Sequence, residues 1–218
     1  MKRWLNEIWQ NYKSLLLFLV LMALFRSAIA DWNDVPTSSM NPTIIEGDRI
    51  LVNKLAYDLR IPFTHVSLFK RGDPESGDII IFDSEVSDLR LVKRVIGVPG
   101  DVVSMDNNVL SINGQQLSYQ SVASEEQTSS AVDAIEKLSG QQYTVRTRPG
   151  SQVSSFSTLT VPADYYFVLG DNRDNSADSR YIGFVPRNEI VGRSRSVVLS
   201  LDYENYLRPR GDRFFKTL

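Results

Sequence analysis

The longest apolar run in the chain covers residues 14–30, and only Ser14, Arg26 and Ser27 interrupt it. As a helix this run would rise roughly 25 Å, and extension back to Trp9 supplies the remaining turns of a bilayer span. The flanking residues suited to the two membrane interfaces are Trp4, Trp9 and Tyr12 before the run and Trp32 after it. Basic residues precede the run (Lys2, Arg3, Lys13) and acidic residues follow it (Asp31, Asp34). The pattern predicts one transmembrane helix with a cytoplasmic N-terminus.

Two other interpretations of this segment stay open. A basic start, an apolar run and the triplet at residues 28–30 (Ala-Ile-Ala) are also typical of a cleavable secretory signal. Arg26, between the apolar run and that triplet, disfavours cleavage after Ala30. A buried helix of a soluble protein is disfavoured because the run has no polar face.

From about residue 35 the pattern changes to short runs rich in Val and Ile, punctuated by Gly, Pro, Asn and Asp. These runs predict strands at 49–54, 78–82, 91–96, 101–105, 109–112, 143–147, 159–161, 165–169 and 190–199. The pairs Asn107-Asn108 and Asn113-Gly114 predict two-residue hairpin turns, because both residue types tolerate positive φ. Without helical periodicity between the strands, we expect a mainly β fold, an antiparallel sheet or barrel.

The polar composition changes in two segments. Residues 121–141 are polar and acidic, and we interpret them as a surface insertion with a short helix at 131–138. Residues 204–218 form a basic tail, which we expect to be frayed; contact with anionic lipid headgroups is the alternative. The predicted organisation is therefore a cytoplasmic stub and anchor at 1–30, an extracytoplasmic domain at 31–203 and the tail.

Composition narrows the chemistry. The formal net charge of −2 argues against nucleic acid as a partner, since nucleic-acid-binding proteins need a basic face. There is no cysteine and a single histidine, His65, which excludes thiol nucleophiles, Cys-ligated metals and His-rich metal sites. A hydrolytic site in this chain would first be sought around a base other than histidine.

The first candidate motif is the Ser/Thr-rich turn at residues 36–43 (PTSSMNPT), with a proline near each end. A serine nucleophile needs a neighbouring base and donors directed at the developing oxyanion. Ser39 is the candidate nucleophile, with its own N–H and the Thr37 hydroxyl as oxyanion donors. Taken alone, such a segment is usually only a solvated linker.

The second motif places Lys93 and Arg94 side by side in an apolar, β-branched run. Adjacent strand residues point to opposite faces, so if Arg94 faces solvent, Lys93 is buried. Burial disfavours the charged ammonium and leaves an amine able to accept a proton near neutral pH. The alternative is that both cations protect an exposed strand edge.

The third motif is the polar cluster at residues 170–180 (GDNRDNSADSR), directly after an apolar strand. It predicts a rigid, salt-bridged loop in which Ser176 could hydrogen-bond a buried lysine amine. A calcium loop built from Asp171, Asp174 and Asp178 is disfavoured, because the spacing departs from the usual loop and two arginines compete for the carboxylates.

Together the three segments resemble the ordered sequence boxes of bacterial type I signal peptidases. Residues 39–43 (SMNPT) are similar to that family's S-M-x-P-T box, 93–101 (KRVIGVPGD) to its K-R-V-x-G-x-P-G-D box, and 170–180 to its G-D-N-R-D-N-S-x-D-S-R box. The resemblance implies a largely β catalytic domain of signal-peptidase type behind one membrane anchor, without a cofactor or metal, on the extracytoplasmic side of the bacterial inner membrane.

The resemblance also implies roles for individual residues. Ser39 is the expected nucleophile, Lys93 the general base and Ser176 the residue that orients Lys93. Thr37 falls where the family places an oxyanion hydroxyl, more usually a serine, and Asp178 and Arg180 fall on a structural ion pair. The expected substrates are signal peptides of secretory preproteins, cut after small residues of the A-x-A type. The side chains expected to line shallow pockets for them are Val35, Pro36, Ile44 and Val92.

Three rival functions are weighed against this one. A self-cleaving repressor-type protease shares the Ser-Lys chemistry, but the membrane segment argues against it, as does the lack of a DNA-binding helix pair. A membrane-tethered module that has lost catalysis is opposed by the presence of both Ser39 and Lys93. The third is an exported protein cleaved after Ala30.

Overall fold

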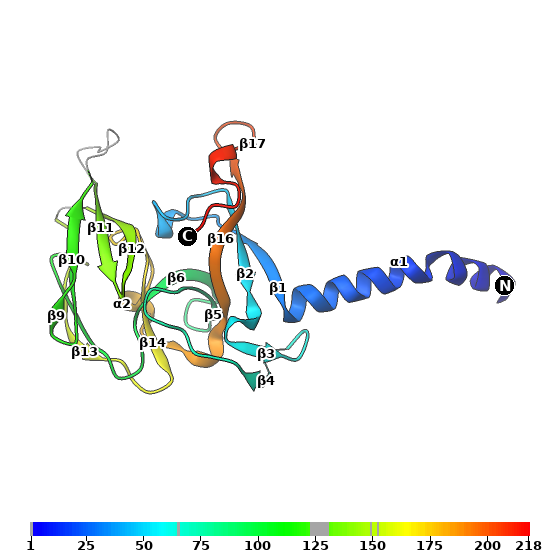
Figure 1. Cartoon of the computed structure of the whole chain (residues 1–218), viewed down its shortest axis with the longest axis horizontal. Coiled ribbons are helices and arrows are strands. Elements are labelled where there is room, and N and C mark those ends of the chain that lie inside the picture. Colours follow the sequence, from blue (N-terminus) through cyan, green and yellow to red (C-terminus); the bar gives the residue numbers. More distant parts are fainter. Residues whose placement is uncertain (1, 65, 123–130, 149, 152) are drawn as a thin grey trace.

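The computed structural model describes residues 2–64, 66–122, 131–148, 150–151 and 153–218, with only the backbone for residues 2–9 and 11. His65 lies outside the described residues. One helix, α1 (Lys2–Ala28), extends away from a β body that contains the remaining elements (Figure 1). The mainly β, antiparallel prediction is confirmed.

The described apolar side chains of α1 do not pack on the β body. Between Leu15 and Phe25 the exposed large apolar side chains have 38–59% of their surface accessible. The buried-helix interpretation is therefore wrong. Among the described residues, no helix meets the length and apolarity required of a membrane span.

The main sheet has the order β1-β2-β16-β5-β6-β14-β15, with β17 on the edge of β16, and its pairs are antiparallel. Its strands are β1 (Ala30–Asp34), β2 (Asp48–Asn53), β5 (Ile79–Ser84), β6 (Leu89–Gly97), β14 (Tyr165–Leu169), β15 (Val185–Pro186), β16 (Ile190–Asp202) and β17 (Arg208–Pro209). Every strand predicted from the sequence overlaps an observed strand. Strand β1, which is rich in polar residues, was not predicted.

Three smaller sheets complete the body. One has the order β13-β7-β8-β9, one β10-β11-β12, and β3 pairs with β4. Their strands are β3 (Asp58–Arg60), β4 (Ser67–Lys70), β7 (Val102–Asp106), β8 (Val109–Ile112), β9 (Gln115–Gln116), β10 (Ser118–Ser121), β11 (Val132–Leu138), β12 (Gln141–Thr147) and β13 (Phe156–Thr160). Short helices are η1 (Ser38–Met40), η2 (Lys54–Ala56), α2 (Ser179–Ile182), η3 (Arg187–Glu189) and η4 (Gly211–Arg213).

The two predicted hairpin turns are present. Asn107 and Asn108 join β7 to β8 with φ of 48° and 65°, and Asn113 and Gly114 join β8 to β9 with φ of 52° and 77°. Positive φ at both central residues matches the twist of the flanking strands. Strands β7, β8 and β9 thus form a meander through the two predicted turns.

The helix predicted at 131–138 is wrong, because these residues form strand β11. It pairs with β10 on one side and β12 on the other. Its side chains Glu136 and Leu138 are buried, so the described part of the 121–141 segment belongs to a packed sheet. Helix-favouring residues such as Ala, Glu and Lys here yield to tertiary pairing. Residues 123–130 lie outside the described part.

The frayed C-terminal tail is also a wrong prediction. Strand β17 pairs with β16, Thr217 forms a bridge with Ser196, and the Leu218 N–H donates to the Arg195 carbonyl at 3.0 Å. Within this tail Arg213 is buried. The tail is docked because its apolar and basic side chains find partners on β2 and β16.

Candidate active site

Ser39 lies on η1, within the loop that connects β1 to β2. Met40 and Ile44 of the same loop are fully buried in a core cluster that also contains Val35. Ser39 itself is half-buried. The apolar neighbours therefore fix the loop while the nucleophile candidate stays accessible from the surface.

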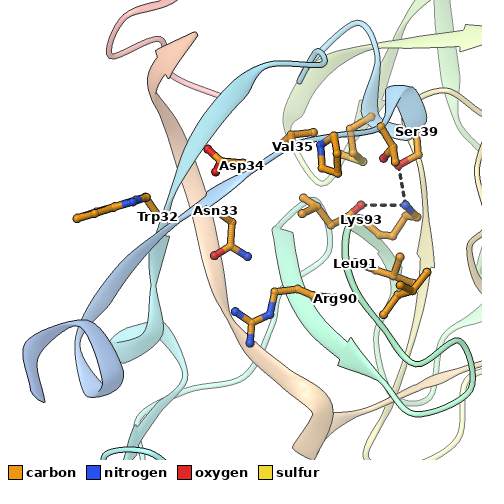
Figure 2. A pocket seen from close by; sticks show the side chains of 13 residues that line it. Trp32, Asn33, Asp34, Val35, Ser39, Arg90, Leu91 and Lys93 are labelled. Atoms are coloured by element: carbon orange, nitrogen blue, oxygen red, sulfur yellow. Dashed lines mark hydrogen bonds between the residues drawn. The ribbon is translucent and has the colours of Figure 1, made fainter. Parts of the chain in front are cut away.

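Lys93 lies on β6, between β5 and β14, and only 2% of its surface is exposed. Its Nζ forms a hydrogen bond with the Ser39 Oγ at 2.7 Å and donates to the Val92 carbonyl at 3.1 Å (Figure 2). The two residues are 54 positions apart in the sequence. The fold thus brings a buried amine to a serine hydroxyl.

The environment of Lys93 shifts its amine toward the neutral form. Burial lowers the pKa of Lys93 from 10.5 to about 8, and the carboxylates of Asp178 and Asp171 offset only part of that shift. The neutral fraction, which is half of the molecules at about pH 8, can accept the proton of a hydroxyl to which the amine is hydrogen-bonded.

Arg94 does not face solvent, which corrects the sequence-based expectation. It leaves β6 on the face opposite to Lys93 and is 3% exposed. Its Nε and Nη2 donate to both carboxylate oxygens of Asp171 at 2.8 and 2.7 Å, and its guanidinium lies 3.7 Å from the centre of the Tyr143 ring. Both faces of β6 are covered here, so Lys93 and Arg94 are both buried. Among the described residues, Arg94 has an ion-pair partner at salt-bridge distance and Lys93 does not.

The 170–178 loop after β14 contacts the Ser39 loop directly. The Asn172 N–H donates to the Ser39 carbonyl at 3.1 Å, and its Nδ2 donates to the Ser38 carbonyl at 3.0 Å. The Asn175 Nδ2 donates to the Ser38 Oγ at 2.9 Å. Sequence reasoning did not assign these asparagines, although two of them in a dense polar loop were a visible signal.

Gly170 is a third residue that the sequence reasoning missed. A Cβ on this residue would collide with the Ser176 Oγ and with the Ser39 carbonyl, and would lie 2.6 Å from the Ser176 Cβ. Only glycine therefore allows β14 to end this close to the Ser39 loop. Its signal was its position at the junction of an apolar strand and a polar loop.

Ser176 is buried beside Gly170, but its hydroxyl has no hydrogen-bond partner among the described residues. Its expected role in orienting Lys93 therefore stays a prediction.

Asp178 and Arg180 form a two-bond ion pair, with Arg180 Nε and Nη2 each 2.8 Å from a carboxylate oxygen. Asp178 Oδ2 also accepts from the Gly170 N–H at 3.0 Å. Asp171 pairs with Arg94 in the same way, so two carboxylates of the calcium alternative are already neutralised by arginines. Within the described part of the chain, no group of three or more His, Cys, Asp or Glu side chains is arranged to hold a metal ion.

A cavity of about 410 Å³ opens beside Ser39 and Lys93 (Figure 2). Its lining residues are Trp32, Asn33, Asp34, Val35, Pro36, Thr37, Ser39, Met40, Leu89, Arg90, Leu91, Val92 and Lys93. The predicted pocket residues Val35, Pro36 and Val92 are among them, as is Thr37, which is exposed. Ile44 is not: it is fully buried in the core beneath the loop, which corrects its assignment to the pocket.

Known proteins match most of this chain. The model of the family described as "Signal peptidase, peptidase S26" matches residues 8–199. Signal peptidase I of Pseudomonas aeruginosa is 36% identical over 203 residues, covering 86% of this chain and 71% of the relative. Signal peptidase I of Bacillus amyloliquefaciens is 34% identical over 197 residues, covering 90% and 88%. A signal peptidase I crystal structure from Enterococcus faecalis is 34% identical, covering 56% of this chain and 97% of that one, with a TM-score of 0.37. The chain therefore belongs to the signal peptidase family, peptidase S26, and is a serine endopeptidase.

Proposed function

We propose that this protein removes signal peptides from exported preproteins, with Ser39 as the nucleophile and Lys93 as the general base. The single observation that carries the proposal is the 2.7 Å contact between the Lys93 Nζ and the Ser39 Oγ, made by an amine that is almost wholly buried. Serine and lysine form a known variant of the catalytic triad.

The mechanism follows from these two groups. Neutral Lys93 takes the proton of Ser39 as its Oγ attacks the scissile carbonyl. The Ser39 N–H and the Thr37 hydroxyl stabilise the oxyanion. Protonated Lys93 then gives its proton to the leaving amine. The Lys93 amine, neutral again, activates the water that hydrolyses the acyl-enzyme. To Ser176, whose buried hydroxyl lies beside the end of β14 without a hydrogen-bond partner among the described residues, we assign the role of accepting from the Lys93 amine and directing it at Ser39.

The cavity beside the dyad offers a place for apolar side chains that precede the cut. Val35, Pro36 and Val92 give it an apolar wall, and Ser39 and Lys93 lie at one end. An apolar wall close to the nucleophile suits the methyl side chains of alanine. We therefore propose cleavage after A-x-A-like sites.

We further propose that α1 anchors the protein in the bacterial cytoplasmic membrane, with a single pass and the β body on the extracytoplasmic side. Three observations support the anchor. The helix extends away from the β body (Figure 1), and its apolar side chains between Leu15 and Phe25 are exposed. Arg26 at its end pairs with Asp31, where a chain leaves a bilayer for water.

The test of the function is cleavage of a preprotein with one A-x-A site by the full-length, detergent-solubilised protein, read by mass. We expect a cut after the second alanine, and none by Ser39→Ala. An inactive but folded parent would favour the tethered, non-catalytic alternative. Equal cutting by both would mean that Ser39 is not the nucleophile. N-terminal sequencing of the mature protein separates an anchor from a signal cleaved after Ala30.

The pKa of Lys93 predicts the pH dependence. Because the base must be neutral in the free enzyme and its pKa is about 8, we expect kcat/KM to fall on the acid side, with half its maximal value near pH 8. Initial rates at low substrate concentration between pH 6 and pH 10 measure this limb. An acid limb centred near pH 5 would instead indicate a carboxylate base.

A further inference from the structure

The loop that carries Ser39 is closed at its base by Asp48. The Val35 N–H donates to the Asp48 carbonyl at 2.8 Å, the Gly47 N–H donates to the Val35 carbonyl at 3.0 Å, and the Ile45 N–H donates to the Asp48 Oδ2 at 3.0 Å. The Asp48 side chain is fully buried. A buried carboxylate needs a partner, and no cation in the loop itself supplies one.

Arg213, which follows Asp48 by 165 residues, is that partner. Its Nε donates to the Asp48 Oδ1 at 2.9 Å and its Nη2 to the Asp48 Oδ2 at 2.5 Å. The same Nη2 donates to the Thr43 carbonyl at 3.0 Å. One buried guanidinium therefore holds the Ser39 loop at two points.

Thr43 extends these contacts to the strand that carries Lys93. Its Oγ1 donates to the Asp171 Oδ2 at 2.5 Å, and Asp171 forms the buried two-bond pair with Arg94. Arg94 is the neighbour of Lys93 on β6. A continuous series of contacts thus joins Arg213 to both partners of the 2.7 Å pair.

Arg213 is itself held by the docked segment 208–218, which we name the C-terminal brace. The Arg210 N–H donates to the Ser200 carbonyl at 2.9 Å, and the Val197 N–H donates to the Lys216 carbonyl at 2.8 Å. Leu218 packs against the core cluster that contains Met40 and Ile44. The brace therefore packs against the same core as the nucleophile loop.

A buried ion pair is a weak source of stability, because apolar side chains of similar size can replace it at little cost. What such a pair fixes is geometry. We propose that Arg213 is a positioning residue that, through Asp48 and Thr43, holds the Ser39 loop at hydrogen-bonding distance from Lys93. This inference rests on the proposed function.

The test compares kcat and KM of full-length variants on a preprotein with an A-x-A site. For Arg213→Met we expect kcat to fall by about 10²-fold, as for a displacement of roughly 1 Å at the reacting atoms, with an unchanged KM. Arg213→Lys, which keeps the charge but not the several N–H donors of the guanidinium, should recover part of the rate. The pH at half-maximal kcat/KM should not move, since burial of Lys93 is unchanged. The matched control is Arg208→Met, in the same brace but exposed, which should behave as the parent.

A second variant guards against a folding defect. In Asp48→Asn/Arg213→Met neither partner of this pair leaves an unpaired buried charge, and the amide oxygen introduced at position 48 can still accept from the Ile45 N–H. We expect this variant to melt near the parent's temperature and to keep the low kcat. A parental kcat in this folded double variant would overturn the proposal, as would a shifted pH midpoint in Arg213→Met.

Amide hydrogen exchange separates this proposal from the proposed function. We expect exchange in residues 41–47 to accelerate in Arg213→Met and in the double variant, but not in Arg208→Met. If the parent fails to cleave preproteins, the proposed function fails while faster exchange still supports the brace. If exchange in 41–47 is unchanged, the positioning role is wrong whatever the activity.

Discussion

Replacing Lys93 with methionine is expected to abolish peptide cleavage and, at the same time, to stabilise the fold at pH 7. The loss of activity should be roughly 10⁴-fold or more, because removing one member of a nucleophile–base pair disables the whole pair. The gain in stability should approach about 3 kcal/mol, because the depressed pKa of Lys93 means that the folded protein holds the charged amine at a cost.

The sign of this linkage follows from the two pKa values. The pKa of Lys93 is about 8 in the folded protein and 10.5 in its ordinary state. Between these pH values the unfolded chain binds more protons than the folded one, so stability rises as pH increases from 8 to 10.5. Below pH 8 the full penalty is present. Lys93→Met should remove both the penalty and the rise.

Urea unfolding followed by far-UV circular dichroism at pH 7, 8.5 and 10 measures this effect on the detergent-solubilised chain. Ser39→Ala is the matched control: it should be equally inactive, yet keep the rise in stability with pH, since its Lys93 remains buried. A Lys93→Met variant less stable than Ser39→Ala at pH 7 would contradict a desolvated amine. Lys93 would then serve catalysis at the expense of stability, since the fold is more stable when this side chain is replaced by methionine.

The sequence predicted what depends on local periodicity. Strands β5, β6 and β14 follow from short Val- and Ile-rich runs, and the positive φ values at Asn107 and Asn113 follow from turn chemistry. Each motif around Ser39 and Lys93 was a weak signal when taken alone, and these two residues became candidates only when the motifs were taken together. Their motifs could be compared in order along the chain.

What the sequence did not predict depends on contacts between distant segments. Residues 132–138 have helix-favouring side chains but become a strand because β10 and β12 lie on either side of them. Arg213 resembled a residue of a solvated tail, and only the fold reveals that it neutralises a carboxylate 165 positions earlier. Gly170 and Asn172 matter because the 170–178 loop contacts the Ser39 loop. No local sequence pattern predicts that contact.

The burial of Arg94 also depends on distant segments, and its replacement is expected to cause the largest loss of stability. Alternation along β6 correctly places Lys93 and Arg94 on opposite faces, but it does not say that β12 and the 170–178 loop cover the Arg94 face. Arg94→Met would leave the Asp171 carboxylate buried with the Thr43 hydroxyl and no cation. We expect the free energy of unfolding to fall by about 3–5 kcal/mol, the usual cost of breaking a buried pair on one side.

Strand β6 also provides the matched control for this prediction. Arg90 pairs with Asp83 through two hydrogen bonds of 2.6 and 2.9 Å, but the two side chains are 41% and 33% exposed. Water solvates these charges when the partner is lost, so Arg90→Met should cost only about 0–1 kcal/mol. The two arginines differ in burial while sharing the strand, the partner type and the substitution.

Urea unfolding of both variants at pH 7 decides whether burial sets the cost. A second substitution tests whether the unpaired Asp171 carboxylate causes the loss. In Arg94→Met/Asp171→Asn that carboxylate is absent, and most of the lost stability should return. Equal destabilisation by Arg94→Met and Arg90→Met would contradict the prediction, as would a double variant no more stable than Arg94→Met. Recovery in the double variant would show that the fold tolerates the absence of this pair. The pair would then serve to hold Asp171 against Thr43, and through it the Ser39 loop against Lys93.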